Sequence, residues 1–192
     1  MHYIEEIKQY QPINEQEVMD KQLIIDYVEC HDQVLTREHV VAHVTASSWI
    51  LNQTHDRVLL VFHNIYNSWS WTGGHADKEA DLLQVALKEA KEETGLKRIF
   101  PIDPHIFSIE SLCVNGHVKR GKYVSSHLHL NVTYLLEAND QDLLFEKVDE
   151  NKAVRWFTFE EVLGAPNEEW MVKVIYQKLY GKVQRLITQG IL

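Results

Sequence analysis

The most constraining feature of the chain is the stretch from Trp71 to Leu96, WTGGHADKEADLLQVALKEAKEETGL. Asp81 and Gly95 are residue types favoured at the two ends of a helix, the N-cap and the position just past the C-terminus. Between them, small and apolar side chains recur at about 100° per residue and form one stripe that would dock on a core. The members of the stripe are Leu83, Ala86, Leu87, Ala90 and Thr94. The spacing therefore predicts an amphipathic helix preceded by a glycine-rich loop.

Three carboxylates share one side of this predicted helix. Glu89 and Glu93 lie four residues apart and border the stripe, and Glu92 lies three residues after Glu89. Carboxylates at these spacings repel one another, and the last turn of a helix disfavours negative charge. A bound Mg²⁺ or Mn²⁺, which prefers oxygen ligands, would offset the repulsion. The alternative is an ordinary solvated face in which Lys88 and Lys91 balance the acids.

The stretch resembles the Nudix box, the signature of the Nudix hydrolases, G-x5-E-x7-R-E-U-x-E-E-x-G-U, where U is a bulky aliphatic residue. Gly74 and Gly95 fall on its two glycines without a gap. The other matching positions are Glu89, Glu92, Glu93 and Leu96. Three positions depart from the pattern. Ala80 replaces the first Glu, Lys88 replaces the Arg, and Ala90 is smaller than the usual aliphatic residue.

The resemblance implies a hydrolase that cleaves a nucleoside diphosphate linked to another group, using metal-activated water. In such a site Glu89, Glu92 and Glu93 would bind Mg²⁺ or Mn²⁺, helped by the main-chain carbonyl of Gly74. The residues at the other positions of the box determine whether every metal ligand and supporting side chain of such a site is present.

Two of the departures bear on that question. Lys88 would orient a neighbouring carboxylate as the Arg does in the family, although lysine lacks the planar two-pronged geometry of arginine. Ala80 leaves a second or third metal ion without a ligand, unless Glu79 or Asp81 takes its place. The resemblance thus assigns supporting roles to Lys88 and Glu79.

The position of the general base varies within the family, so the candidates stand in two places. Glu92 and Glu93 belong to the box, and Asp149 and Glu150 lie in the later segment KVDENKAVRW. Base catalysis needs a carboxylate within reach of the attacking water. The alternative for Asp149 and Glu150 is an exposed turn.

Four residues outside the carboxylate cluster are predicted to contact the substrate. His75 follows Gly74 directly and could touch phosphate, whereas Tyr66 and Trp71 could stack on a base. His129 would line the substrate cleft from a polar face of a strand. The alternatives are a loop histidine, aromatic packing in the core and a simple polar sheet face.

Two further clusters carry weaker indications. His127 and His129 would place two imidazoles on one strand face, but no third soft ligand stands at a spacing typical of zinc sites. Lys119 and Arg120 stand on a predicted hairpin and could reach phosphates, or could form an exposed basic turn.

The order of predicted elements indicates an α/β protein with the Nudix fold, an α/β/α sandwich with a mixed sheet. Residues 1–36 read as a helical extension, with Asn14 as a helix cap and Glu17 completing a capping box. Residues 37–192 would form the Nudix domain, with strands from Val40 onward and a long C-terminal helix. Residues 64–74 are predicted to form a loop.

The composition of the chain limits the kinds of molecule that it is expected to bind. A formal net charge of −9 argues against a nucleic-acid polymer, because phosphate neutralisation needs clustered basic residues. The sequence contains neither a signal peptide nor an apolar stretch long enough to span a membrane. Cys30 and Cys113 fit no metal-binding spacing. These features predict a cytoplasmic protein that acts on a small molecule, with N-terminal helices that could mediate a homodimer.

Two other functions stay open at this point. An enzyme like isopentenyl diphosphate isomerase, on the same fold, would need a catalytic cysteine near the pocket, and Cys113 is the candidate. A non-catalytic domain that binds a nucleotide and regulates a partner is the second alternative, and Ala80 and Lys88 favour it.

Overall fold

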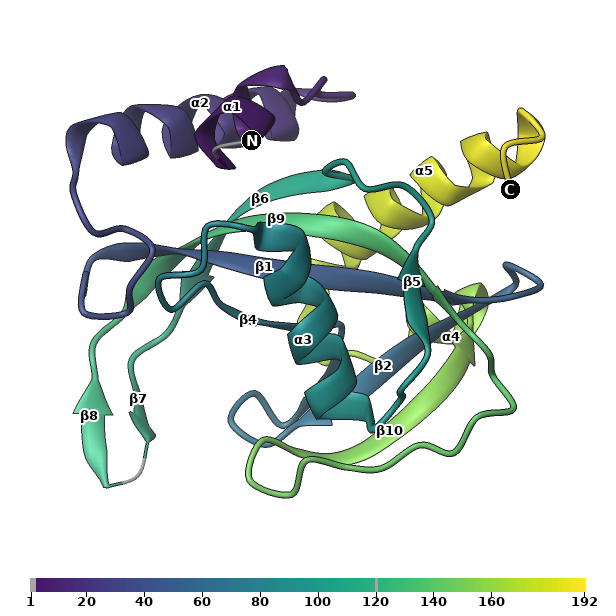
Figure 1. Ribbon diagram of the computed structural model, residues 1–192. Helices are drawn as coiled ribbons and strands as arrows, with labels where there is room; N and C mark the ends of the chain where they lie inside the picture. Colours follow the sequence, from purple (N-terminus) through teal and green to yellow (C-terminus); the bar gives the residue numbers. More distant parts are fainter. Residues whose placement is uncertain (1–2, 120) are drawn as a thin grey trace. The chain divides into compact units, whose positions relative to one another are not determined.

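The computed structural model describes residues 3–119 and 121–192 (Figure 1). Arg120, one of the two basic residues predicted on the hairpin, lies outside the described residues. The chain forms two compact units, and most of the boundaries between them fall within single elements. These elements are strand β1 (Ala42–Asn52), strand β4 (Thr72–His75), helix α3 (Leu82–Thr94) and strand β9 (His127–Ala138).

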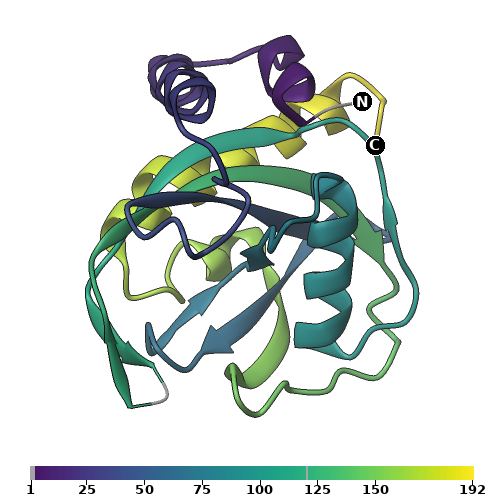
Figure 2. The ribbon, with the colours of Figure 1, turned by 60° about the vertical axis from the view of Figure 1, so that its left-hand side comes forward.

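The first unit combines the N-terminal helices with strands from the middle of the chain. Its α2 packs against β6, and α1 lies beside α2 (Figure 2). Strand β6 pairs with β9 in antiparallel register from Ser108↔Thr133 to Val114↔His127. The other elements of this unit form a hairpin and a short strand beside β1. The bounds are α1 (Tyr3–Gln9), α2 (Glu15–Cys30), β4 (Thr72–His75), β6 (Ser108–Val114), β7 (His117–Lys119) and β8 (Lys122–Val124).

Helix α2 begins with the predicted cap at Asn14, whereas the Glu17 side chain bonds to the N–H of Ile13, one residue before the cap. The side chain of Asn14 accepts a hydrogen bond of 2.9 Å from the backbone N–H of Glu17. The carboxylate of Glu17 is fully buried and accepts hydrogen bonds from Tyr10 Oη at 2.7 Å and from the Ile13 N–H at 2.9 Å. Burial, reinforced by the charge of Glu17, raises the pKa of Tyr10. The Glu17 carboxylate therefore links the C-terminal end of α1 to the N-terminal end of α2.

The second unit is built on strand β2, which pairs with β10 and β3 in antiparallel register, for example Leu60↔Arg155 and Val61↔Ser70. In the main sheet the strand order is β10-β2-β1-β9-β5. None of the helices among the described residues is long and apolar enough to cross a membrane. The bounds are β2 (Arg57–His63), β3 (Ser68–Ser70), β5 (Ile99–Pro101), β10 (Asn151–Thr158), α4 (Phe159–Val162), the π-helical η1 (Met171–Tyr176) and α5 (Gln177–Thr188).

The elements confirm the predicted mixed α/β fold with a mixed sheet, and they correct two details. Residues 64–74 do not form one loop, because β3 and β4 lie within them. Trp69 on β3 explains part of this difference, since its ring packs edge-on against Phe62 and Phe157 at centroid distances of 5.4 and 4.7 Å. The long C-terminal helix is π-helical over η1 before it continues as α5.

Helix α3 ends at Gly95, as predicted. The φ angle of this residue is +73°, in the left-handed region, and its N–H donates to the Lys91 carbonyl at 3.0 Å. A Cβ atom here would lie 2.8 Å from the Cβ of Phe145, which packs over the helix end. Glycine thus satisfies both a backbone angle and a close contact.

Replacing Gly95 with Ala should lower the free energy of unfolding by about 2 kcal/mol, from left-handed strain and the overlap with Phe145. Urea denaturation measures the change. Gly181→Ala is the matched control, because a Cβ there has no neighbour within 4 Å. Equal stability of Gly95→Ala and the wild type would show that this helix end tolerates a side chain.

Candidate metal centre

The loop before α3 fixes the start of the helix. Asp81 Oδ1 accepts a hydrogen bond of 3.1 Å from the Gln84 N–H, which confirms Asp81 as the N-cap. Glu79 Oε1 in turn accepts a hydrogen bond of 2.9 Å from the Asp81 N–H, and both carboxylates are exposed. Glu79, expected to support the metal ligands, thus has a hydrogen bond that orders this loop.

The buried face of α3 differs from the predicted stripe. Leu82 and Val85 are buried, whereas Leu83 and Leu87 are only partly covered. The buried face of α3 therefore lies nearer to the glutamates than the predicted stripe does, and Glu93 is only 4% exposed. A buried carboxylate needs compensation by hydrogen bonds or by a cation, because burial disfavours its charge.

The two glycines of β4 allow the strand to approach its neighbours closely. A Cβ atom on Gly74 would lie 2.4 Å from Cδ of Glu89, a distance that side chains do not tolerate. A Cβ on Gly73 would lie 2.5 Å from Oγ of Ser47 and 2.9 Å from the carbonyl oxygen of Ala46. Gly74 is therefore packed closely against the Glu89 carboxylate.

In the second unit, the carboxylates of Glu93 and Glu150 lie close together. Carboxylate oxygens of Glu93 and Glu150 lie within 4.8 Å of each other, and Glu89 lies one turn before Glu93 on α3. Lys147 Nζ lies 3.0 Å from Glu92 Oε2 and 3.1 Å from Glu150 Oε2. Burial opposes the charge of Lys147, but hydrogen bonds to the two glutamates outweigh it and raise its pKa. Lys147 thus offsets part of the negative charge of Glu92, Glu93 and Glu150.

The segment that carries Glu150 is tied to the end of α3. The Phe145 N–H donates to the Thr94 carbonyl, and Asn151 Nδ2 donates to the Glu93 carbonyl, both at 2.9 Å. Asn151 Oδ1 accepts a hydrogen bond of 3.1 Å from the Lys147 N–H. These bonds hold the segment beside Glu93. Sequence reasoning missed Lys147 and Asn151, because neither matches a position of the box.

The donor set fits a hard divalent cation. Carboxylate oxygens are the ligands that Mg²⁺ and Mn²⁺ prefer, and the glycine at position 74 leaves space that a Cβ would fill. Among the residues that the structure describes, no imidazole or thiolate belongs to the Glu93–Glu150 group. Asp149, the other candidate base, is exposed.

The predicted substrate residues fall into two groups. In the second unit, Trp71 is buried, with its ring 5.7 Å from that of Tyr176, which matches the packing alternative. Tyr66 is 40% exposed, and its ring lies 4.5 Å from that of His63. Tyr66 thus has the more accessible ring for stacking. His75 and His129 lie in the first unit.

His75 and His129 meet a third imidazole there, that of His43 on β1. Side-chain nitrogens of the three residues lie within 4.8 Å of one another. The Ala76 N–H donates to the Val44 carbonyl at 3.1 Å, which aligns the end of β4 with β1. A third imidazole, which no spacing in the sequence revealed, therefore lies beside the other two, and the three residues come from strands far apart in the chain.

Burial lowers the pKa of all three histidines. It lowers the pKa of His75 to about 3, with the charge of Arg37 as the next cause. Burial, followed by His75 and His43, lowers the pKa of His129 to about 2. The pKa of His43 is also lowered, again mainly by burial.

Cys113 and Lys88 are the remaining candidate residues, and neither belongs to the histidine group. Cys113 is exposed and stands opposite Leu128 on β9, whereas His129 stands opposite Leu112. Since side chains alternate along a strand, Cys113 points to the other face from His129. The pKa of Asp77 is lowered mainly by its hydrogen bond to Arg37, which outweighs the opposing effect of burial. The charge of Lys88 lowers this pKa further.

Comparisons with known proteins match most of the chain. A family model described as NUDIX domain matches residues 41–178, more than half of the chain. The asymmetrical bis(5'-nucleosyl)-tetraphosphatase of Rattus norvegicus is 26% identical over 129 residues, which are 67% of this chain and 77% of that protein. The Mus musculus protein of the same name is 25% identical over the same shares.

Solved structures show the same fold. A C. elegans Ap4A hydrolase binary complex has 18% sequence identity and a TM-score of 0.50, over 76% of this chain and 98% of that one. A NUDIX family hydrolase from Clostridium perfringens has 22% identity and a TM-score of 0.52, over 75% and 97%. At these identities the likeness establishes the fold alone.

Proposed function

The chain belongs to the Nudix hydrolase family, and we propose that it uses a divalent cation, Mg²⁺ or Mn²⁺, to hydrolyse a phosphoanhydride bond. The substrate is a nucleoside diphosphate linked to a second group. The observation that carries the proposal is the position of Glu93. It is a buried carboxylate on α3 with Glu150 within 4.8 Å, one turn after the Glu89 that packs against Gly74.

In this proposal Glu89, Glu92 and Glu93 hold the cation, together with the Gly74 carbonyl. When bound, the cation would offset the phosphate charge and lower the pKa of the attacking water. Lys147 neutralises the Glu92 and Glu150 side chains when they do not face a cation.

Glu93 or Glu150 accepts the proton of the attacking water. A bond forms between the water oxygen and phosphorus while the bridging oxygen–phosphorus bond breaks, and the bridging oxygen leaves on the second phosphate. Glu150 can act this way because Asn151 and Phe145 tie its segment to α3. A positioned carboxylate typically contributes about 10²- to 10⁴-fold to the rate.

The relatives suggest where a substrate search should begin. Both curated relatives are named for hydrolysis of a bis(5'-nucleosyl) tetraphosphate, which contains a nucleoside diphosphate linked to another group. We place a dinucleoside tetraphosphate first among the candidate substrates. His75, His129 and Tyr66 are the residues still proposed to contact it, whereas the buried Trp71 packs against Tyr176 instead.

A panel of dinucleoside tetraphosphates, nucleoside triphosphates and nucleotide sugars, each with Mg²⁺ or Mn²⁺, tests the proposal. We expect release of a nucleotide from at least one compound, and loss of activity with excess chelator. Calorimetry on the same panel distinguishes the regulatory alternative. Tight nucleotide binding without turnover of any compound would overturn the hydrolase.

Replacing Asn151 with Ala should lower kcat and weaken Mn²⁺ binding by about 10- to 100-fold, because residues that orient a site have effects of this size. The variant removes the hydrogen bonds to the Glu93 carbonyl and from the Lys147 N–H. Asn115→Ala, in an exposed loop, is the matched control. Unchanged kinetics of Asn151→Ala would show that this segment does not contribute to the site.

A further inference from the structure

We propose that His43, His75 and His129 form a second metal site, for a borderline transition ion such as Zn²⁺. The three side chains come from β1, β4 and β9, and their nitrogens lie within 4.8 Å of one another. Their ring centroids are separated by 4.9 to 5.1 Å. Imidazole nitrogen is a typical ligand of Zn²⁺, whereas the carboxylates of α3 suit Mg²⁺ or Mn²⁺.

His43 provides the most direct indication of a ligand. Its side chain is almost completely buried, and Nδ1 lies 3.1 Å from the His39 carbonyl oxygen. Donation from Nδ1–H to that carbonyl leaves a lone pair on Nε2, which is buried without a hydrogen-bond partner among the described residues. Metal-binding histidines have this arrangement, in which one nitrogen donates to a carbonyl and the other binds the ion. A buried nitrogen without a partner is costly unless a ligand satisfies it.

His127 supports the orientation of the group. Its Nδ1 lies 2.8 Å from the Ser125 carbonyl oxygen, and its Nε2 lies 3.3 Å from His129 Nε2. The His127 ring also stacks on that of His43 at a centroid distance of 4.9 Å. A fourth imidazole therefore packs against two of the three proposed ligands and limits how their rings can turn.

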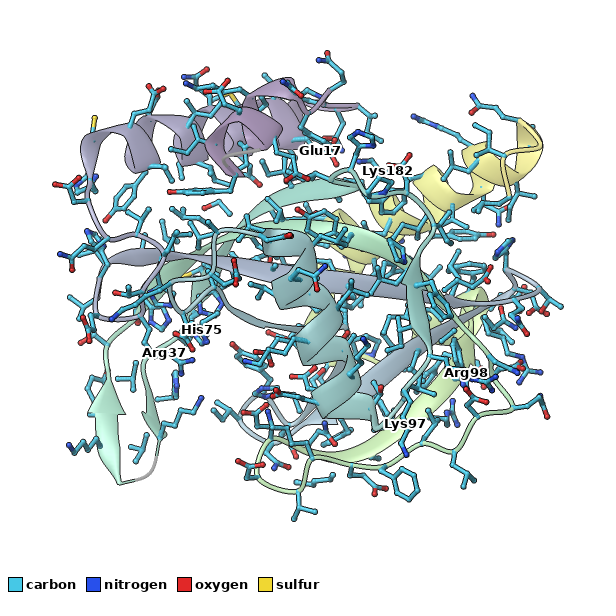
Figure 3. The ribbon with its side chains drawn as sticks, viewed as in Figure 1. Glu17, Arg37, His75, Lys97, Arg98 and Lys182 are labelled. Carbon is cyan, nitrogen blue, oxygen red and sulfur yellow. The ribbon has the colours of Figure 1, made fainter. Side chains whose placement is uncertain are left out.

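The charges near the site permit a cation. Arg37 lies close to His75 (Figure 3), but its Nε donates to Asp77 Oδ1 at 2.9 Å, and this carboxylate balances its charge. The neutral form of an imidazole is the one that offers a lone pair to metals. Three histidine ligands leave one tetrahedral position for water or a substrate oxygen.

Zn²⁺ binding in the presence of excess Mg²⁺ tests the site without relying on hydrolysis. Calorimetry on the wild-type protein should give one Zn²⁺ per chain, and Co²⁺ substitution should give the visible absorption of a tetrahedral site. His43→Gln and His129→Gln should each weaken Zn²⁺ binding by about 100-fold or more. Because His43 is buried, His75→Gln, at a partly exposed position, repeats the test with less risk to folding.

The control variants separate this site from the proposed catalytic one. His105→Gln removes an exposed imidazole bonded to Asp103, and it should leave Zn²⁺ binding unchanged. Glu92→Gln should also leave Zn²⁺ binding unchanged while it affects turnover. Zn²⁺ affinity that is equal in the wild type and the three histidine variants would overturn the proposal. Absence of Zn²⁺ uptake by the wild type would overturn it as well.

Discussion

Replacing Glu93 with Gln is expected to lower kcat by about 1,000-fold at saturating Mg²⁺. The substitution keeps the shape of a buried side chain but removes a charge that both binds the cation and can accept a proton. Loss of a general base alone costs about 10²- to 10⁴-fold. Steady-state assays with the best substrate of the panel measure the effect, and thermal unfolding checks that the variant is folded.

Two further variants make this result interpretable. Glu92→Gln changes an exposed ligand on the same helix, so it should reduce activity without affecting stability. Glu169→Gln removes an exposed carboxylate paired with Lys173 and should leave kcat unchanged. A folded Glu93→Gln protein with wild-type kcat would place the catalytic centre away from α3.

Replacing Gly74 with Ala is expected to lower kcat by about 100-fold. The new Cβ would overlap with the Glu89 carboxylate, at 2.4 Å from its Cδ, and one of the two must move. A displacement of about 1 Å in a catalytic group can cost 10²-fold in rate. Kinetics across a Mg²⁺ titration measure the effect, because a displaced ligand also raises the Mg²⁺ concentration needed for half-maximal activity.

Gly164→Ala is the control for this prediction, because a Cβ there would meet only the Glu161 carbonyl oxygen, at 3.9 Å. It should have wild-type kinetics. If Gly74→Ala also retained full activity, the Gly74 segment and Glu89 would have no shared role in catalysis.

Local signals were the part of the structure that sequence could predict. Asn14 and Asp81 cap helices because their side chains accept hydrogen bonds from N–H groups two or three residues ahead. Gly95 ends α3 because its backbone adopts a left-handed angle that few other residues tolerate. Each of these effects depends on a few consecutive residues, so the pattern of residue types is sufficient.

Contacts between distant segments could not be predicted in the same way. His43, His75 and His129 come together only because three strands meet, and no spacing in the chain connects them. Lys147 and Asn151 likewise act on the end of α3 from more than fifty positions away. The resemblance to the Nudix box identified the helix and its glutamates but not the side chains that neutralise and hold them.

The polar face of β9 has one feature that the local sequence predicts and one that depends on distant segments. Because side chains alternate along a strand, Asn131 and Thr133 share a face with His129, but alternation does not reveal that this part of the face is buried. There, Asn131 and Thr133 donate hydrogen bonds to Glu110, at 3.0 and 2.9 Å. Ser108 Oγ lies within hydrogen-bonding distance of both Glu110 and Glu17, and Glu17 belongs to α2. The N-terminal helices therefore cover and satisfy this face.

Binding of Mn²⁺ to the wild type and to Glu93→Gln, followed by electron paramagnetic resonance alongside turnover, tests the central claim most directly. The claim is that the α3 carboxylates bind the cation needed for hydrolysis. It predicts that the wild type binds Mn²⁺ and is active, and that Glu93→Gln loses both properties together. Equal Mn²⁺ binding by the two proteins, or full activity of the chelator-treated wild type without added metal, would contradict it.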